Sequence, residues 1–131
     1  MKKYYAGATY IFSDGAGTGD VTLATTTKLP DNAIVNEVSI YCEQPITSVG
    51  GCSIKVIAGA IDLTTAIAKA DLTNEAVVTG MGTLPAAGVK LTAAADIGIE
   101  VVTTAVTSPV GPLALKDILQ IRVGYFIGTA E

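Results

Sequence analysis

The chain of 131 residues contains no histidine and no tryptophan, and only 15% of its residues are charged. Histidine is the usual general base beside a serine or cysteine nucleophile, so its absence excludes the common catalytic triads. A zinc site needs about four ligands, and without histidine the thiols of Cys42 and Cys52 are too few to form one. We therefore expect no metal, no cofactor and no catalysis of these kinds.

Basic clusters and long apolar runs are also missing. Eight lysine and arginine residues are scattered between Lys2 and Arg122, and twelve acidic residues bring the net charge to −4. Phosphate binding depends on clustered basic side chains, so nucleic acid is not an expected partner. The longest uncharged run, residues 101–115, is broken by two prolines and falls short of the roughly 20 apolar residues of a spanning helix. Because the first residues are also too polar and aromatic for a secretory signal, we expect a soluble protein without a membrane partner.

What the chain does contain is aliphatic residues, threonine and glycine. Half of its residues are hydrophobic although only 5% are aromatic, and the mean hydropathy is +0.52. β-Branched residues favour strands, and the length suits one domain spanning residues 1–131. Apolar residues also occupy positions predicted for the second face of strands, such as Val35, Ile57 and Val102. We interpret this surplus as surface that neighbouring subunits cover.

Alternation with a period of two residues predicts the strands. Residues 33–43 should turn one set of apolar side chains to the core, namely Ile34, Val38, Ile40 and Cys42, and Val35 should face the other way with Glu37. Further strong candidates are residues 52–58, 96–104 and 119–127, and weaker ones are residues 3–12, 21–28, 76–79 and 89–92. About eight short strands between turns rich in glycine and proline predict an all-β fold, an antiparallel β-sandwich, a jelly roll or a related barrel.

Two connecting segments leave alternatives open. Residues 43–51 are predicted to be the loop of a hairpin, so Cys42 and Cys52 could face each other as a disulfide or as two small buried apolar residues. In residues 62–75, Asp62 could cap a helix whose apolar residues have helical spacing, Leu63, Ile67 and Ala70. A short helix and an irregular crossing loop both fit this segment.

Motifs for catalysis or ligand binding are weak. The glycine-rich residues 15–20 lack the ending of a phosphate-binding loop and a following helix, so a flexible turn is favoured. Asp14 and Asp20 match no calcium-loop spacing. Carboxylate-pair chemistry would need facing acids, but Glu37 and Glu100 fall on outward strand positions, where a solvated side chain explains them. We therefore expect no catalytic residue.

Aromatic residues are concentrated at the start of the chain. Four of the seven lie within residues 1–12, which we predict to be an N-terminal arm or a first strand: Tyr4, Tyr5, Tyr10 and Phe12. Because interface cores are enriched in aromatic residues, these four are candidates for a partner interface. In the alternative, Tyr10 and Phe12, spaced by two, face the core of their own domain. The interface is favoured for Tyr4 and Tyr5.

Several short phrases carry a family resemblance. Residues 28–38 read KLPDNAIVNEV and are followed by QPITS at 44–48, residues 89–97 read VKLTAAADI, and residues 123–127 read VGYFI. In this pattern, over about residues 20–128, the chain resembles small virion proteins of tailed bacteriophages. The resemblance implies a β-sandwich or jelly-roll subunit that acts as a capsid decoration or cement protein, most often as a homotrimer, and it implies no catalytic residue. Residues 108–116 depart from the pattern, because they contain two prolines where a short turn of the last hairpin would be expected.

From the composition and the resemblance we expect a structural virion protein rather than an enzyme. It would bind the major capsid protein and stabilise a phage head by burying surface between capsid subunits, in a particle assembled in the host cytoplasm. A tail or head-fibre component is the alternative within the same class. A carbohydrate-binding module used for adsorption is the alternative from another class.

Overall fold

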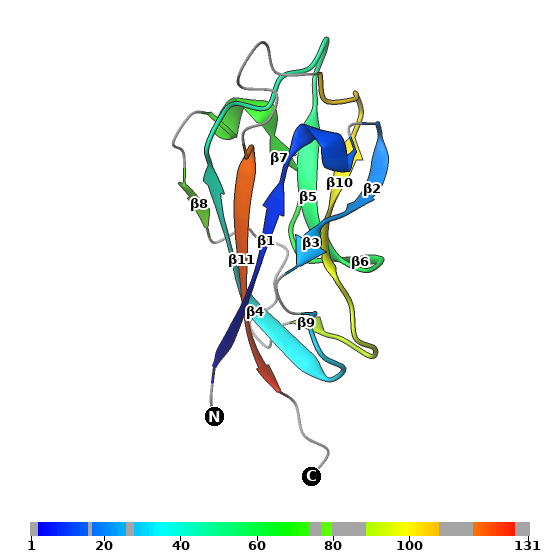
Figure 1. Ribbon diagram of the computed structural model, residues 1–131, viewed down its shortest axis with the longest axis vertical. Helices are drawn as coiled ribbons and strands as arrows, with labels where there is room; N and C mark the ends of the chain where they lie inside the picture. The colour runs from blue at the N-terminus through cyan, green and yellow to red at the C-terminus, as the bar shows by residue number, and fades with distance from the viewer. Residues whose placement is uncertain are drawn as a thin grey trace.

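The computed structural model describes residues 3–15, 17–25, 28–73, 77–79, 89–107 and 117–127, and within them the chain forms two antiparallel sheets (Figure 1). The first sheet has the spatial order β3 (Ala24–Thr25), β1 (Tyr4–Tyr10), β11 (Leu119–Ile127), β4 (Ala33–Cys42) and β8 (Val77–Thr79), with β9 (Val89–Lys90) also paired to β4. The second has the order β2 (Gly19–Thr22), β10 (Ile97–Val102), β5 (Ser53–Ala58) and β6 (Ile61–Asp62), with β7 (Ile67–Ala68) also paired to β5. Two short 3-10 turns, Phe12–Asp14 and Lys69–Asp71, complete the described elements. The predicted all-β sandwich is confirmed.

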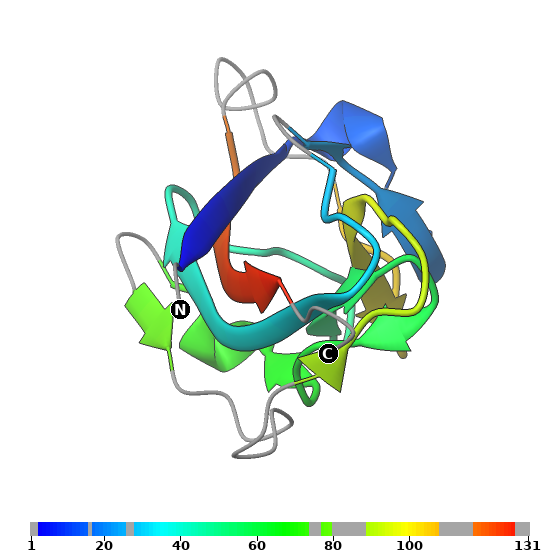
Figure 2. The same cartoon turned by 90° about the horizontal axis from the view of Figure 1, so that it is seen from below.

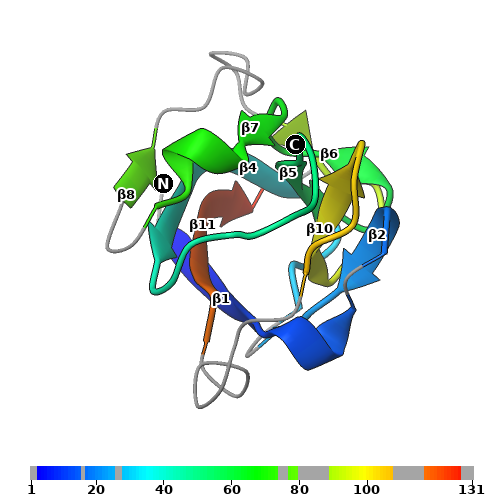
Figure 3. The same cartoon turned by 90° about the horizontal axis from the view of Figure 1, so that it is seen from above.

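The first strand is a central part of the first sheet. β1 pairs with β11 along its whole length, from Tyr4 opposite Tyr125 to Tyr10 opposite Leu119. Strand β1 begins and β11 ends at the same end of the molecule (Figures 1 and 2). Seen from the other end, β1, β8 and β11 lie on one side of the interior and β2, β6 and β10 on the other (Figure 3).

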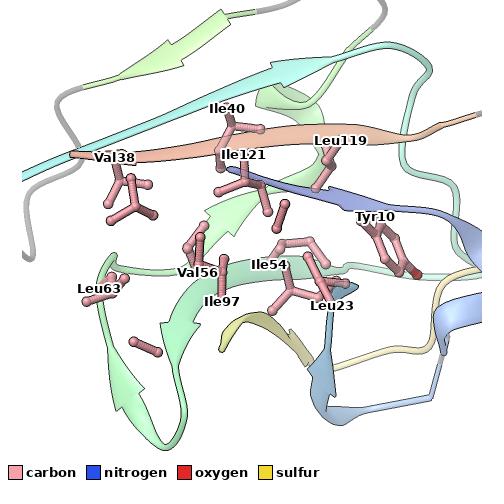
Figure 4. Close-up of a cluster of buried hydrophobic side chains, with 14 of the residues drawn as sticks. Tyr10, Leu23, Val38, Ile40, Ile54, Val56, Leu63, Ile97, Leu119 and Ile121 are labelled. Atoms are coloured by element: carbon pink, nitrogen blue, oxygen red, sulfur yellow. The ribbon is translucent and has the colours of Figure 1, made fainter. Parts of the chain in front are cut away.

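Inward side chains of the two sheets meet in one hydrophobic core. The close-up of this core shows side chains of β4 and β11 above those of β5, namely Val38, Ile40, Leu119 and Ile121 above Ile54 and Val56 (Figure 4). Each of these side chains is at most 3% exposed. Burying a side chain of this size stabilises the fold by about 1.5–3 kcal/mol, so the core is what holds the two sheets together.

Strand β4 contains a bulge that changes which side chains face the core. Its register against β11 shifts between Gly124 and Tyr125, which leaves Asn36 of β4 without a directly opposite residue. One extra residue moves the two-residue alternation by one position. As a result Val35 is fully buried and Ile34 only half-buried, so the predicted orientation of these two residues is wrong.

The apolar surplus lies mostly inside the subunit. Val35 reaches the core because of the bulge, and Ile57, on the outward side of the second sheet, is only 3% exposed. The Ile57 side chain lies close to Gly98, where a Cβ would stand 3.3 Å from Cγ1 of Ile57. Val102 is half-buried. The prediction that Val35 and Ile57 form surface for neighbouring subunits is therefore wrong.

The predicted hairpin between residues 33–43 and 52–58 is also wrong, because β4 and β5 belong to different sheets. The connection between them crosses from one sheet to the other and is tied down by hydrogen bonds. The backbone N–H of Thr107 donates to the carbonyl oxygen of Thr47 at 2.7 Å, and Nζ of Lys69 donates to Oγ of Ser48 at 2.9 Å. Strands β10 and β11, expected to form the last hairpin, likewise lie in different sheets, and residues 108–116 fall outside the described part.

The structure decides the two questions that the sequence left open, the state of the two cysteines and the conformation of residues 62–75. Cys42 and Cys52 are free and buried, which confirms the interpretation as two small apolar residues. The segment 62–75 is an irregular crossing segment through β7 and the turn Lys69–Asp71, and its described residues contain no α-helix. Asp62 does not cap a helix, because its Oδ2 accepts a hydrogen bond from Nζ of Lys55 at 3.2 Å.

Candidate functional site

The four aromatic residues predicted for a partner interface divide between core and surface. Tyr10 is 0% exposed, and its hydroxyl donates to the carbonyl oxygen of Gly15 at 2.7 Å. Burial, and after it the charge of Asp14, raises the pKa of Tyr10 to about 12. Phe12 is half-buried and packs against the core. The alternative in which Tyr10 and Phe12 face their own domain is the one that the structure shows, so the interface prediction is wrong for Tyr10.

Tyr4 and Tyr5 lie where β1 begins, and they are 39% and 50% exposed. Successive residues of a strand point to opposite sides of the sheet. Tyr4 shares its side with the buried Ala6 and stacks on the ring of Tyr125, with 5.7 Å between centroids. Tyr5 stands on the opposite side. A partner interface at Tyr4 and Tyr5 stays a prediction.

We call the side of the first sheet that points away from the second sheet the outer face. Directly opposite residues of neighbouring strands form its rows, which are Thr9–Gln120–Tyr41–Val77, Gly7–Arg122–Ser39 and Tyr5–Gly124–Glu37. Three exposed large hydrophobic residues of the described chain stand on this face: Tyr5, Tyr41 and Val77. The outer face therefore combines exposed apolar surface with charge.

At the end of the outer face where β1 begins, two cations share one carboxylate. Nζ of Lys3 donates to Oε1 of Glu37 at 2.6 Å, and Nη2 of Arg122 donates to Oε2 at 3.3 Å. The hydrogen bond from Lys3 is the main cause that lowers the pKa of Glu37, and Arg122 adds to it. The guanidinium of Arg122 lies 4.5 Å from the ring centroid of Tyr5. This group of Lys3, Tyr5, Glu37 and Arg122, the cationic cluster, keeps one net positive charge.

Two glycines shape the outer face. A Cβ at Gly124 would stand 2.8 Å from Cε of Lys3 and 3.1 Å from Cε1 of Tyr5, so only glycine lets these side chains lie so close to β11. Gly7 is one of the residues that line a shallow hollow of about 330 Å³, the others being Ser39, Ile40, Tyr41, Val77, Gln120, Ile121 and Arg122. The hollow is mainly apolar, and the exposed side chain of Arg122 is one of the groups that line it.

At the other end of the outer face, Gln120 holds two carboxylates together. Its amide nitrogen donates to Oδ2 of Asp117 at 2.9 Å and to Oε2 of Glu43 at 3.2 Å. The hydroxyl of Thr9 donates to its Oε1 at 2.7 Å, which orients the amide. No ion pair joins Glu43 or Asp117 to another described residue. We call Glu43 and Asp117 the acidic pair.

Elsewhere the described residues offer little for chemistry. They contain no group of three or more histidine, cysteine, aspartate or glutamate side chains that could hold a metal ion. No helix among them is long and apolar enough to cross a membrane. Burial raises the pKa of the thiols of Cys42 and Cys52, which disfavours the reactive thiolate. Gly19 begins strand β2, so the glycine-rich segment leads into a strand and not into the helix of a phosphate site.

Of the residues that stand out on the outer face, Tyr5 was identified from the sequence as an interface candidate, and Arg122, Tyr41, Val77 and Glu43 were not. Arg122, the only arginine of the chain, sits at an outward position of a strongly predicted strand. Arginine is enriched at interface hot spots, so this position could have been singled out. Tyr41, Val77 and Glu43 could not, because alternation along a strand does not reveal which strands are neighbours.

The comparisons with known proteins concern the fold. The architecture is that of an antiparallel β-sandwich protein. No protein-family model matches the chain, and no curated protein matches its sequence. The fold is similar to that of a chain in the structure described as "Acidic stable capsid structure of Helicobacter pylori bacteriophage KHP30", with a TM-score of 0.59 and 17% sequence identity. The similarity covers 97% of this chain and 89% of that chain.

Proposed function

We propose that this chain is a structural protein of a phage particle, a decoration or cement subunit that binds the major capsid protein on the head. The observation that carries the proposal is the similarity in fold, over 97% of the chain, to a chain of a phage capsid structure. The sequence resemblance to small virion proteins points the same way. The exposed aromatic and charged groups of the first sheet support a function by surface burial, without turnover of a substrate.

The proposal also specifies the oligomeric state of the protein and the residues that contact the capsid. A homotrimer, put together in the host cytoplasm and carried in the virion, is the oligomer that the resemblance implies. A closed ring covers strand edges that a free subunit leaves open to aggregation. Tyr4 and Tyr5 are the proposed contacts with the capsid, because both are exposed at the same end of the sandwich, on opposite sides of β1, and aromatic side chains supply much of the energy at interfaces.

Capsids that lack the protein provide the test. Adding the purified chain should raise the temperature at which these capsids disassemble, measured by light scattering. The double variant Tyr4→Ser/Tyr5→Ser should bind more weakly and protect less. Ile61→Ser is the matched control, since Ile61 is 37% exposed, close to the 39% of Tyr4, but lies at the edge of the second sheet. Absence of binding by the unaltered chain would contradict the function, and an equal loss in both variants would contradict the role of the two tyrosines.

A further inference from the structure

The charges of the outer face are separated along its strands. On β11 and the residues just before it, Asp117 of the acidic pair comes first, then the neutral Gln120, and then Arg122 of the cationic cluster. On β4 and the residue just after it, Glu37 of the cationic cluster and Glu43 of the acidic pair lie on either side of Tyr41. The row Thr9–Gln120–Tyr41–Val77 therefore stands between a positive and a negative end.

Such a surface is complementary to itself, and we propose that two copies of this chain pair through their outer faces about a two-fold axis. An axis that lies in the plane of the interface, along the row of Gln120 and Tyr41 and therefore across the strands, turns the positive end of one copy onto the negative end of the other. Arg122 of each copy then lies opposite Glu43 of the second copy, so the contact occurs twice. In a two-fold interface the same patch serves both subunits, which is what charges of both signs on one face allow.

The groups at the proposed axis suit a packed contact. Tyr41 is 37% exposed and Val77 is 67% exposed, and both line the hollow. The pairing lays Tyr41 of one copy over the hollow of the other, which removes apolar surface from water on both sides. Arg122 is already held by the ring of Tyr5 and by Glu37, so little side-chain freedom is lost when it meets a carboxylate.

The pairing leaves the end with Tyr4 and Tyr5 uncovered. Strand β4 ends at Cys42, only one residue before Glu43, so the Tyr5 row of each copy lies at the edge of the overlap or beyond it. The inference goes beyond the proposed function and does not depend on it, because the mass of the purified chain is measured without capsids. It is compatible with a trimer, in which case two trimers pair into a hexamer.

Sedimentation equilibrium of the purified protein tests the pairing. At about 0.1 M salt, where the Debye length is about 10 Å, we expect an even number of subunits, and at about 1 M, where it is about 3 Å, weaker pairing. Arg122→Glu should raise the dissociation constant of the pair roughly a hundredfold, because each pair contains the contact twice. Lys28→Glu is the matched control, since it changes the net charge equally at an exposed residue away from the outer face. It should pair as the unaltered chain does.

The opposite reversal, Glu43→Lys, should weaken pairing in the same way. Of the acidic pair, Glu43 is chosen for the reversal and not Asp117, because Asp117 adjoins Lys116, which lies outside the described residues. An equal mixture of the Arg122→Glu and Glu43→Lys chains should pair again, because a two-fold contact between them has opposite charges at both positions. Circular dichroism checks that each variant folds. If Arg122→Glu does not fold, the Glu43→Lys variant alone tests the pairing.

Three results would overturn the inference. The first is an unaltered chain that stays monomeric or purely trimeric at about 0.1 M salt. The second is pairing that neither reversal weakens more than Lys28→Glu does. The third is a mixture of the two reversed chains that remains unpaired although both are folded. Each result leaves the capsid experiment with the tyrosine variants unaffected, so a failure of the pairing is distinct from a failure of the proposed function.

Discussion

Gly98 in the middle of β10 should not tolerate a methyl group. A Cβ at this position would stand 2.6 Å from the carbonyl oxygen of Val21 and 3.3 Å from Cγ1 of Ile57. Carbon–oxygen contacts between adjacent strands are normally about 3.3–3.6 Å, so β2 would have to move by about 0.7 Å or more. The obstacle on the β2 side is backbone, and a side-chain rotation cannot relieve it.

The expected cost follows from two opposing effects. Forcing an extra carbon into a packed site destabilises a protein by about 1–3 kcal/mol. Replacing glycine by alanine also restricts the unfolded chain, which offsets about 0.4–1 kcal/mol of that loss. Taking the middle of both ranges, Gly98→Ala should therefore lower the free energy of unfolding by about 1.3 kcal/mol, which corresponds to a fall in Tm of about 5 °C for a chain of this size. The shift of β2 should weaken its pairing with β10, including the hydrogen bond from Leu23 N–H to the Ile97 carbonyl oxygen, which is 3.1 Å long.

Gly7→Ala provides the matched control. A Cβ at Gly7 would have Ile121 O as its nearest neighbour, at 3.6 Å, which is an ordinary contact. The same chemical change should therefore stabilise this strand by about 0.4–1 kcal/mol. Urea unfolding followed by circular dichroism gives both free energies by linear extrapolation. If Gly98→Ala were as stable as Gly7→Ala, the close approach of β2 to β10 would be refuted.

Three further results are expected from the titratable groups. The pKa of Glu37 is lowered below its ordinary 4.5, so the stability that Glu37 contributes is present above pH 4.5 and is lost as the pH falls through the lowered pKa. Glu37→Gln should therefore lose less stability than the unaltered chain over this range in acid unfolding curves. Equal losses of stability in the two proteins would contradict the Lys3 contact. Tyrosinate absorbance should show one residue that ionises only near pH 12, a component that Tyr10→Phe abolishes. The thiols of Cys42 and Cys52 should resist a thiol reagent in the native protein and react fully after unfolding, whereas rapid labelling of the native protein would contradict their burial.

Strand positions could be predicted from the sequence because alternation is a local property. Residues 119–127 and 33–42 are strands as expected, and Glu37 and Arg122 point outward as their positions indicated. The reversal of Ile34 and Val35 could not be foreseen, since it depends on an extra residue that becomes evident only when β4 is aligned with β11. A bulge is a property of a pair of strands, and a single strand carries no sign of it.

The partners of the strands depend on contacts far apart in the sequence. Residues 43–51 have the composition of a hairpin loop, yet β4 already has β11 on one side and β8 and β9 on the other, so the chain must leave the sheet after Cys42. The interface residues were missed for the same reason. Arg122, Tyr41 and Val77 become one surface only because β11, β4 and β8 are neighbours.

The composition of the core explains the high aliphatic content of the chain, without a surplus of apolar residues on the surface. Among the buried hydrophobic residues that the structure describes, only Tyr10 and Tyr125 are aromatic. Interiors are packed to a nearly constant density, so a core built from alanine, valine, isoleucine and leucine takes more residues to fill the same volume than one containing large aromatic rings. The high aliphatic content, and with it the mean hydropathy of +0.52, therefore agrees with a core that contains few aromatic rings. The proposed assembly rests instead on where the exposed large hydrophobic residues lie: of the six among the described residues, four belong to the first sheet, namely Tyr4, Tyr5, Tyr41 and Val77.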